Sequence, residues 1–155
     1  MKYRRLTLDE LKDFEKEFVA YLIMNGIDAA EWTRVKDKDT SKADAILDEF
    51  SDSIFEGILT KVDHIAYSED RALHLYHLGD TEASVLAVTT MDHKILDLAL
   101  ILTDETYQRT LHITLSSEKY NGSRSQSIFD RMESGAFIVM PGIFDKFRSL
   151  MALSN

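Results

Sequence analysis

The chain has 155 residues, the length of one domain, and its 45% hydrophobic and 29% charged content is close to the average of globular proteins. This composition excludes a disordered or collagen-like chain, and the absence of cysteine excludes disulfides, zinc–thiolate sites and cysteine nucleophiles. The net charge of −9 argues against a nucleic acid partner, because such binding needs clustered lysine and arginine. We expect a single domain over residues 1–155.

The N-terminal sequence favours a cytoplasmic protein. The basic start, Met1–Arg5, is followed by a charged stretch from Leu6 to Glu17 and lacks the apolar core of a secretory signal. The longest apolar run, Ala136–Phe144, contains a proline and a glycine and is shorter than the roughly 18 residues of a membrane span. We therefore expect no membrane partner.

Residues 1–60 carry the periodicity of amphipathic helices. A capping box, Thr7–Glu10, opens an apolar stripe that ends at Asn25-Gly26, since glycine readily takes the conformation of a C-cap. Asp28 repeats the N-cap signal and opens a short helix. A longer helix starts at Thr40 or Ser41. The sequence therefore predicts three helices in this part of the chain.

From residue 61 the apolar period becomes two. The segments Val62–Tyr67, Ala72–Leu78 and Ala83–Thr89 are rich in β-branched and aromatic residues, which favours strands. The turn signals between them, Ser68–Asp70 and Gly79-Asp80, are too short for a parallel crossover. This pattern predicts an antiparallel meander.

The segment Met91–Ser116 fits two interpretations. Leucines alternate with other residues between Ile95 and Leu102, which suits a buried strand or a short buried helix. The alternation from Leu111 to Leu115 is typical of a strand. We predict two further strands joined around Asp104-Glu105, and a helix within residues 92–105 is the alternative.

Two helices are expected near the C-terminus. Ser123 and Gln126 fit a third capping box, whose helix ends at Ser134-Gly135, and the last helix follows Pro141. Helices therefore precede and follow the strands without alternating with them. The predicted fold is α+β, with N-terminal helices packed on a four- to five-stranded antiparallel sheet that is closed by two C-terminal helices.

Three segments resemble a small family of uncharacterised bacterial proteins. They are Met1–Thr7 with the acidic amphipathic helix behind it, Ser125–Asp130, and Glu133–Gly135. The resemblance covers most of the chain length. It implies a bacterial intracellular protein, and it brings no activity and no site residues.

Histidines are the first candidates for chemistry. His74 and His77 would share one face of a helix, but on a strand they point to opposite faces. A two-residue turn at Gly79-Asp80 would set His77 opposite Glu82, a pair that supplies fewer ligands than the three a catalytic zinc needs. We therefore expect no metal and no cofactor, and the simpler interpretation is a half-exposed cross-strand pair.

The same predicted register sorts the other polar residues between the two sheet faces. His74 would lie opposite Val85 and beside Ile65, and His64 beside Leu75. One face then carries His64, His77 and Glu82, and the other carries Asp63, His74 and Tyr76. Acids that flank the sheet would raise one another's pKa if their loops converged, and otherwise they are surface acids. These acids are Asp92, Asp97, Asp104 and Glu105.

The segment Asn121–Ser125 places small residues and an arginine at a helix start, where backbone amides can hold an anion. The candidate ligand-binding residues are Ser123, Arg124, Ser125 and Lys119, with Arg109 nearby. A capping box after a turn explains the same residues without a ligand.

A dense apolar segment, Ala136–Met140, is followed by Ile143-Phe144. Two interpretations fit: the chain buries these side chains itself, or it shares them with a second copy across a two-fold axis. The candidate interface residues are Phe137, Val139, Met140 and Phe144.

No nucleophile elbow, phosphate-binding loop or dinucleotide fingerprint is present, so no catalytic residue is assigned. The leading hypothesis is a non-catalytic protein that contacts a protein partner or itself as a homodimer. One alternative is a module that binds a small anion near Ser123. The other is an enzyme that uses His77 and Glu82 or the loop carboxylates.

Overall fold

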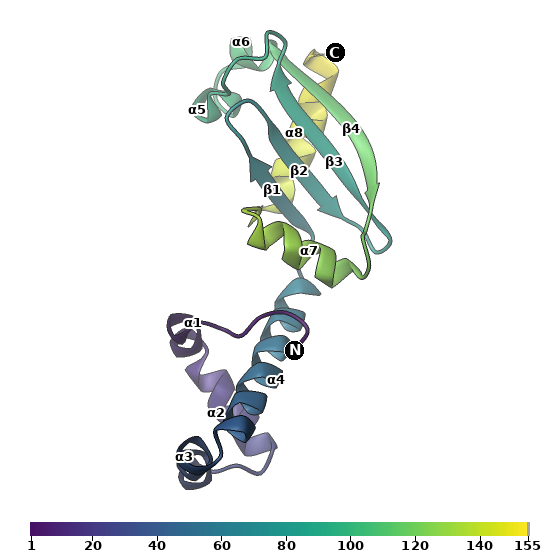
Figure 1. Ribbon diagram of the computed structural model, residues 1–155. Coiled ribbons are helices and arrows are strands. Elements are labelled where there is room, and N and C mark those ends of the chain that lie inside the picture. Colours follow the sequence, from purple (N-terminus) through teal and green to yellow (C-terminus); the bar gives the residue numbers. More distant parts are fainter. Residues whose placement is uncertain (155) are drawn as a thin grey trace. The chain divides into compact units, whose positions relative to one another are not determined.

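A computed structural model describes residues 1–154 of the chain (Figure 1). The chain divides into two compact units, one from Met1 to Thr60 and one that begins at Lys61. Within residues 1–154 the first unit is helical, and the second contains the sheet and the remaining helices. The expectation of a single domain over 1–155 stays a prediction.

Four helices build the first unit. They are α1 (Leu8–Asp13), α2 (Glu15–Met24), α3 (Ala29–Lys38) and α4 (Thr40–Leu59). The capping box of α1 is confirmed, because the Thr7 hydroxyl accepts from the Glu10 amide at 3.2 Å and the Glu10 carboxylate accepts from the Thr7 amide at 2.8 Å. The expected continuous stripe is divided at Phe14, where α1 ends and α2 begins. Asp39 caps α4 through the Lys42 amide.

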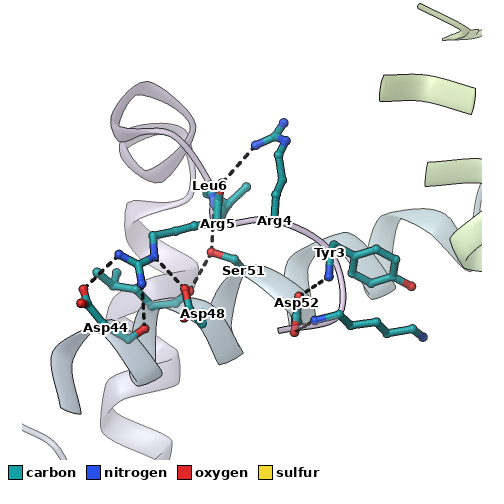
Figure 2. Close-up of polar contacts among 10 residues, drawn as sticks. Tyr3, Arg4, Arg5, Leu6, Asp44, Asp48, Ser51 and Asp52 are labelled. Atoms are coloured by element: carbon teal, nitrogen blue, oxygen red, sulfur yellow. Dashed lines mark hydrogen bonds and ion pairs between the residues drawn. The ribbon is translucent and has the colours of Figure 1, made fainter. Parts of the chain in front are cut away.

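The N-terminal segment lies along α4 and is held by the polar side chains of that helix (Figure 2). The backbone amides of Lys2 and Tyr3 donate to the Asp52 carboxylate at 2.5 and 2.8 Å. Arg5 donates to Asp48 at 2.7 Å, and the Leu6 amide donates to the Ser51 hydroxyl at 3.0 Å. Part of the positive charge of the N-terminal segment is therefore paired with carboxylates of α4.

Aromatic packing supports the helical unit. Leu22 of α2 packs with Val35 of α3 and Ala43 of α4, and the rings of Phe18 and Trp32 meet edge to face with centroids 5.3 Å apart. Such pairs add to the free energy of burial. Trp32 is thus a packing residue of this unit.

The second unit is built on a five-stranded antiparallel sheet. Its strands are β1 (His64–Ser68), β2 (Leu73–Leu78), β3 (Glu82–Thr90), β4 (Leu111–Lys119) and β5 (Phe137–Ile138). Their order across the sheet is β4-β3-β2-β1-β5. β1 to β3 form the predicted meander, and β4 pairs with β3. The α+β class and the two C-terminal helices are confirmed. Within residues 1–154, no helix has both the length and the apolar character that a membrane crossing demands.

The strand register differs from the prediction by two residues. Leu78 pairs with Ala83, so four residues separate the last paired positions of β2 and β3 in place of two. A side chain at Gly79 would place its Cβ 2.7 Å from the Glu82 carbonyl oxygen, so this turn requires glycine. As a result His77 lies opposite Ser84, and the predicted pairing of His77 with Glu82 is wrong.

The other predicted neighbours shift in the same way. His74 lies opposite Ala87 and Tyr67, and not Val85 and Ile65. His64 lies opposite His77, and not Leu75. Because a shift of two residues preserves the alternation, the predicted separation of His64 and His77 from His74 and Tyr76 on opposite faces is confirmed.

The first of the two strands predicted within Met91–Ser116 is wrong. Residues 98–101 form the short helix α5 (Leu98–Ile101), and residues 105–108 form α6 (Glu105–Gln108). The carboxylate of Asp97 accepts from the amides of Ala99 and Leu100, and that of Asp104 accepts from the Tyr107 amide. The leucine pattern fits both a strand and a helix, and the aspartate N-caps favour the helix.

α8 (Pro141–Ser154) lies behind the sheet in Figure 1, and α7 (Arg124–Glu133) lies at the lower end of the sheet. Phe144, Phe147 and Leu150 of α8 form the core with side chains of β1 to β4. These strand residues are Ala66, Leu73, Leu75, Leu86, Val88, Leu111 and Ile113.

Candidate functional site

The outer edge of β4 is one end of the sheet, since the strand order of the described residues stops there. β4 has nine residues, and its positions from Thr114 to Lys119 are exposed. Leu115 lies on the face that α8 covers, yet 42% of it is exposed. The only carboxylate and ammonium groups of the strand, Glu118 and Lys119, lie at its end. An edge of this length without central charges lacks the usual protection against pairing with another strand.

The predicted apolar interface is divided by the structure. Phe137 and Met140 are 47% and 77% exposed, and Ile138 between them is 53% exposed. Phe144 belongs to the core beneath the sheet, and the Val139 amide donates to the His64 carbonyl at 3.2 Å. The exposed apolar surface here is therefore the edge strand β5 together with Met140.

The predicted anion-binding residues lie around the start of α7. The Ser123 hydroxyl caps the helix by accepting from the Gln126 amide at 3.1 Å. The Arg124 guanidinium turns away from the helix start and donates to the carbonyl oxygens of Val62 and Leu78 at 2.6 and 3.1 Å. Lys119 is exposed at the end of β4. Anion binding here stays a prediction, and the Arg124 guanidinium has backbone partners in place of an anion.

Two histidines meet on the face that α8 covers. His64 and His77 stack with their ring centroids 4.8 Å apart, and Phe144 lies 6.0 and 5.9 Å from the two rings. The Nδ1 atom of His64 is buried without a hydrogen-bond partner. Burial, and then the neighbouring His77, lower the pKa of His64 below its ordinary value. This arrangement favours a neutral His64.

The flanking acids have structural partners of their own. Asp97 and Asp104 cap α5 and α6, Asp92 pairs with Lys94 at 2.8 Å, and Glu105 pairs with Arg109 at 2.9 Å. Within residues 1–154, no three histidine, aspartate or glutamate side chains are arranged to hold a metal ion.

A cavity of about 470 Å³ lies between the C-terminal half of α7 and the sheet face that α8 does not cover. It is lined by Tyr67, Glu69, His74, Tyr76, Asp130, Arg131, Ser134 and Ala136. The sequence places His74 and Tyr76 on one sheet face, but no pattern in it indicates that α7 docks there.

Arg131 organises one wall of this cavity. It donates to the Tyr76 hydroxyl at 3.2 Å and pairs with the Glu118 carboxylate of β4, and its guanidinium lies 4.7 Å from the centre of the Tyr76 ring. Burial is the main cause that raises the pKa of Tyr76 above its ordinary value. The Tyr76 hydroxyl therefore stays protonated at neutral pH and is held in place by Arg131.

Comparison with known proteins gives one match. A family model described as a family of unknown function, DUF6495, matches residues 1–152. No curated protein and no solved structure matches the chain. The match extends over almost the whole chain, as the resemblance to an uncharacterised family predicts. The chain belongs to the DUF6495 family.

Proposed function

We propose that this protein acts through protein–protein contact, and that its contact surface is the open edge of β4, which pairs with the β4 edge of a second copy. The observation that carries the proposal is the nine-residue edge strand whose central positions bear no carboxylate or ammonium group. Edge strands are ordinarily short, charged or covered, because their free backbone groups bind other strands.

The β4 strand can pair with its own copy in the antiparallel direction about a central leucine. A two-fold axis at Leu115 brings all nine residues of β4 into register, with Leu111 opposite Lys119 of the second copy. Leu115 then meets its own equivalent and loses its 42% exposure. His112 lies opposite Glu118 of the second copy, which places a hydrogen-bonding pair on each side of the axis.

The face alternation of the sheet agrees with this register. Leu115 shares its face with the buried Leu111 and Ile113, so that pairing about Leu115 keeps the apolar face of both copies on one side. The result is a continuous sheet of two five-stranded halves. In this register the pairing within each five-stranded sheet is kept.

Light scattering after size exclusion tests the proposal at micromolar protein. The wild-type chain is expected to have the mass of a dimer. Leu115→Lys is expected to have the mass of a monomer, because two ammonium groups would meet at the axis, and to keep its circular dichroism, because Leu115 is exposed at the sheet edge. The matched control is Met140→Lys, which adds the same charge at the opposite edge.

Cysteine cross-linking tests the register itself. The chain has no cysteine, so Leu115→Cys carries a single thiol. Directly opposite residues of antiparallel strands have Cα atoms about 4.5–5.5 Å apart, which a disulfide can bridge. Oxidation is expected to yield a covalent dimer for Leu115→Cys and none for Met140→Cys.

Two results would overturn the proposal. If the wild-type chain is still a monomer at about 100 μM, the Kd of self-association is too weak for a stable contact. A dimer that Leu115→Lys preserves and Met140→Lys dissociates would move the interface to β5, in agreement with the apolar segment Phe137–Met140 predicted from the sequence.

A further inference from the structure

The cavity beneath α7 has polar groups with spare hydrogen-bonding capacity. The His74 ring lines the cavity, and its Nδ1 atom is buried without a hydrogen-bond partner. Asp130 accepts one hydrogen bond, from the Gln126 side chain at 3.0 Å, and a carboxylate can accept several.

The charges around the cavity are unequal. Arg131 is already paired with Glu118 and bonded to the Tyr76 hydroxyl. Two further carboxylates, Glu69 and Asp130, line the cavity, and neither has an ion-pair partner within residues 1–154. The lining therefore attracts a positive charge, and an anion that approached Arg131 would meet three carboxylates.

Aromatic groups form the apolar part of the wall. Tyr67 and His74 lie opposite each other on β1 and β2, and Tyr76 follows on the same face. The Tyr67 ring packs against Gly135, where an added Cβ would lie 3.4 Å from the ring. Rings beside carboxylates are the features that recognise organic cations.

We propose that this cavity is a binding site for a small organic ammonium ion with an apolar or aromatic substituent. Glu69 and Asp130 accept from the ammonium group, and the tyrosine rings and the His74 ring contact the substituent. The volume of about 470 Å³ lies within the range of small-molecule sites. This site does not rest on the proposed β4 contact, but Glu118, the partner of Arg131, lies on β4, so the tests below compare wild type with Leu115→Lys.

Three probes of similar shape and different charge test the ligand class: phenethylammonium, phenylethanol and phenylpropanoate. Thermal unfolding of the full chain is followed at millimolar probe, in wild type and in Leu115→Lys, so that a change in self-association is not mistaken for binding. Phenethylammonium is expected to raise the melting temperature in a saturable way, because it binds the folded state, and phenylpropanoate is expected to have no effect.

Matched variants locate the site. Glu69→Gln removes one cavity carboxylate and is expected to weaken phenethylammonium binding roughly tenfold in calorimetry, the loss that corresponds to one charged hydrogen bond. Asp130→Asn is expected to have the same effect. Glu82→Gln is the control, because it makes the same change on β3, on the opposite sheet face, and leaves the affinity unchanged.

Nitrogen NMR of labelled histidine detects binding at a ring directly and separately from a change in stability. Phenethylammonium is expected to shift the Nδ1 resonance of His74 and to leave that of His112 in place. The proposal is overturned if phenylpropanoate binds and phenethylammonium does not, if none of the three probes binds at millimolar concentration, or if binding survives in the double variant Glu69→Gln with Asp130→Asn.

Discussion

His64 and His77 lie directly opposite each other on β1 and β2, and their imidazole rings stack with centroids 4.8 Å apart. Phe144 of α8 contacts both rings from the core side. A proton on His64 would place a charge in this partly buried stack, beside a second titratable ring. Burial and the neighbouring His77 lower the pKa of His64 for this reason.

This stack predicts that stability falls as the pH drops below 6.5. Because the folded-state pKa of His64 lies below its ordinary value of 6.5, the unfolded chain binds the proton first, and the stability present above pH 6.5 is lost as pH falls toward the folded-state pKa. His64→Phe removes this proton. Urea unfolding at pH 7.5 and 5.5, followed by circular dichroism, is expected to show a smaller loss for His64→Phe than for wild type. Equal losses would contradict the prediction.

We expect the stability of the helical unit to depend on pH through Glu10. Hydrogen bonds from Arg4 and Thr7 lower its pKa to about 2 from an ordinary value of 4.5, so its contribution to stability is present above pH 4.5 and is lost as pH falls through about 2. At pH 7 Glu10→Gln is expected to destabilise the unit by about 1 kcal/mol, since the side chain is partly exposed and solvent screens the ion pair. Fluorescence of Trp32, the single tryptophan, reports this unfolding. The difference from wild type should shrink below pH 4.5 and disappear only as the pH falls below about 2.

Ser51 predicts the cost of an unsatisfied buried amide. Its hydroxyl is fully buried, accepts from the Leu6 amide at 3.0 Å and donates to the Leu47 carbonyl at 2.7 Å. Ser51→Ala leaves the Leu6 amide without this acceptor and is expected to cost about 1–3 kcal/mol. Ser53→Ala, on the exposed side of α4, is the control. Denaturant unfolding followed by Trp32 fluorescence compares the two variants, and equal stability would contradict the assignment.

Arg124 predicts a structural role at the start of α7. Its guanidinium donates to the carbonyls of Val62, Leu78 and Gly79, which lie before β1 and at the end of β2. Lysine cannot satisfy three separated carbonyls with the same planar geometry, so Arg124→Lys is expected to cost about 2 kcal/mol. Arg148→Lys, at an exposed position of α8, should cost little. Thermal unfolding checks the pair. A rise in melting temperature with phosphate, in wild type only, would instead support anion binding at Ser123.

Local signals in the sequence are sufficient for most of the secondary structure. The caps at Thr7, Asp28 and Ser123 and the alternation after residue 60 all depend on neighbouring residues, and the structure confirms them. The predicted register of β2 and β3 was wrong because register depends on loop length. A Gly-Asp signal is compatible with a turn of two or of four residues. The strand prediction for Leu98–Ile101 was wrong because the helix cap of Asp97 and a strand-like alternation occur in the same stretch of sequence.

The candidate site was not predictable in the same way. The cavity requires α7 to lie across β1 and β2, so that Arg131 reaches Tyr76 and Glu118, which are 55 and 13 residues away in sequence. Contacts at these separations leave no periodic signal. The edge position of β4 likewise follows only from the strand order, because β5 adds to β1 and leaves β4 uncovered.

The position of α8 in the core has a consequence for synthesis of the chain on the ribosome. Phe144, Phe147 and Leu150 cover apolar side chains of four strands that are all translated before them. The emerging meander therefore has a bare apolar surface until the final helix leaves the exit tunnel. Nascent chains that stall before Pro141 are expected to be substrates for chaperones that bind extended hydrophobic segments.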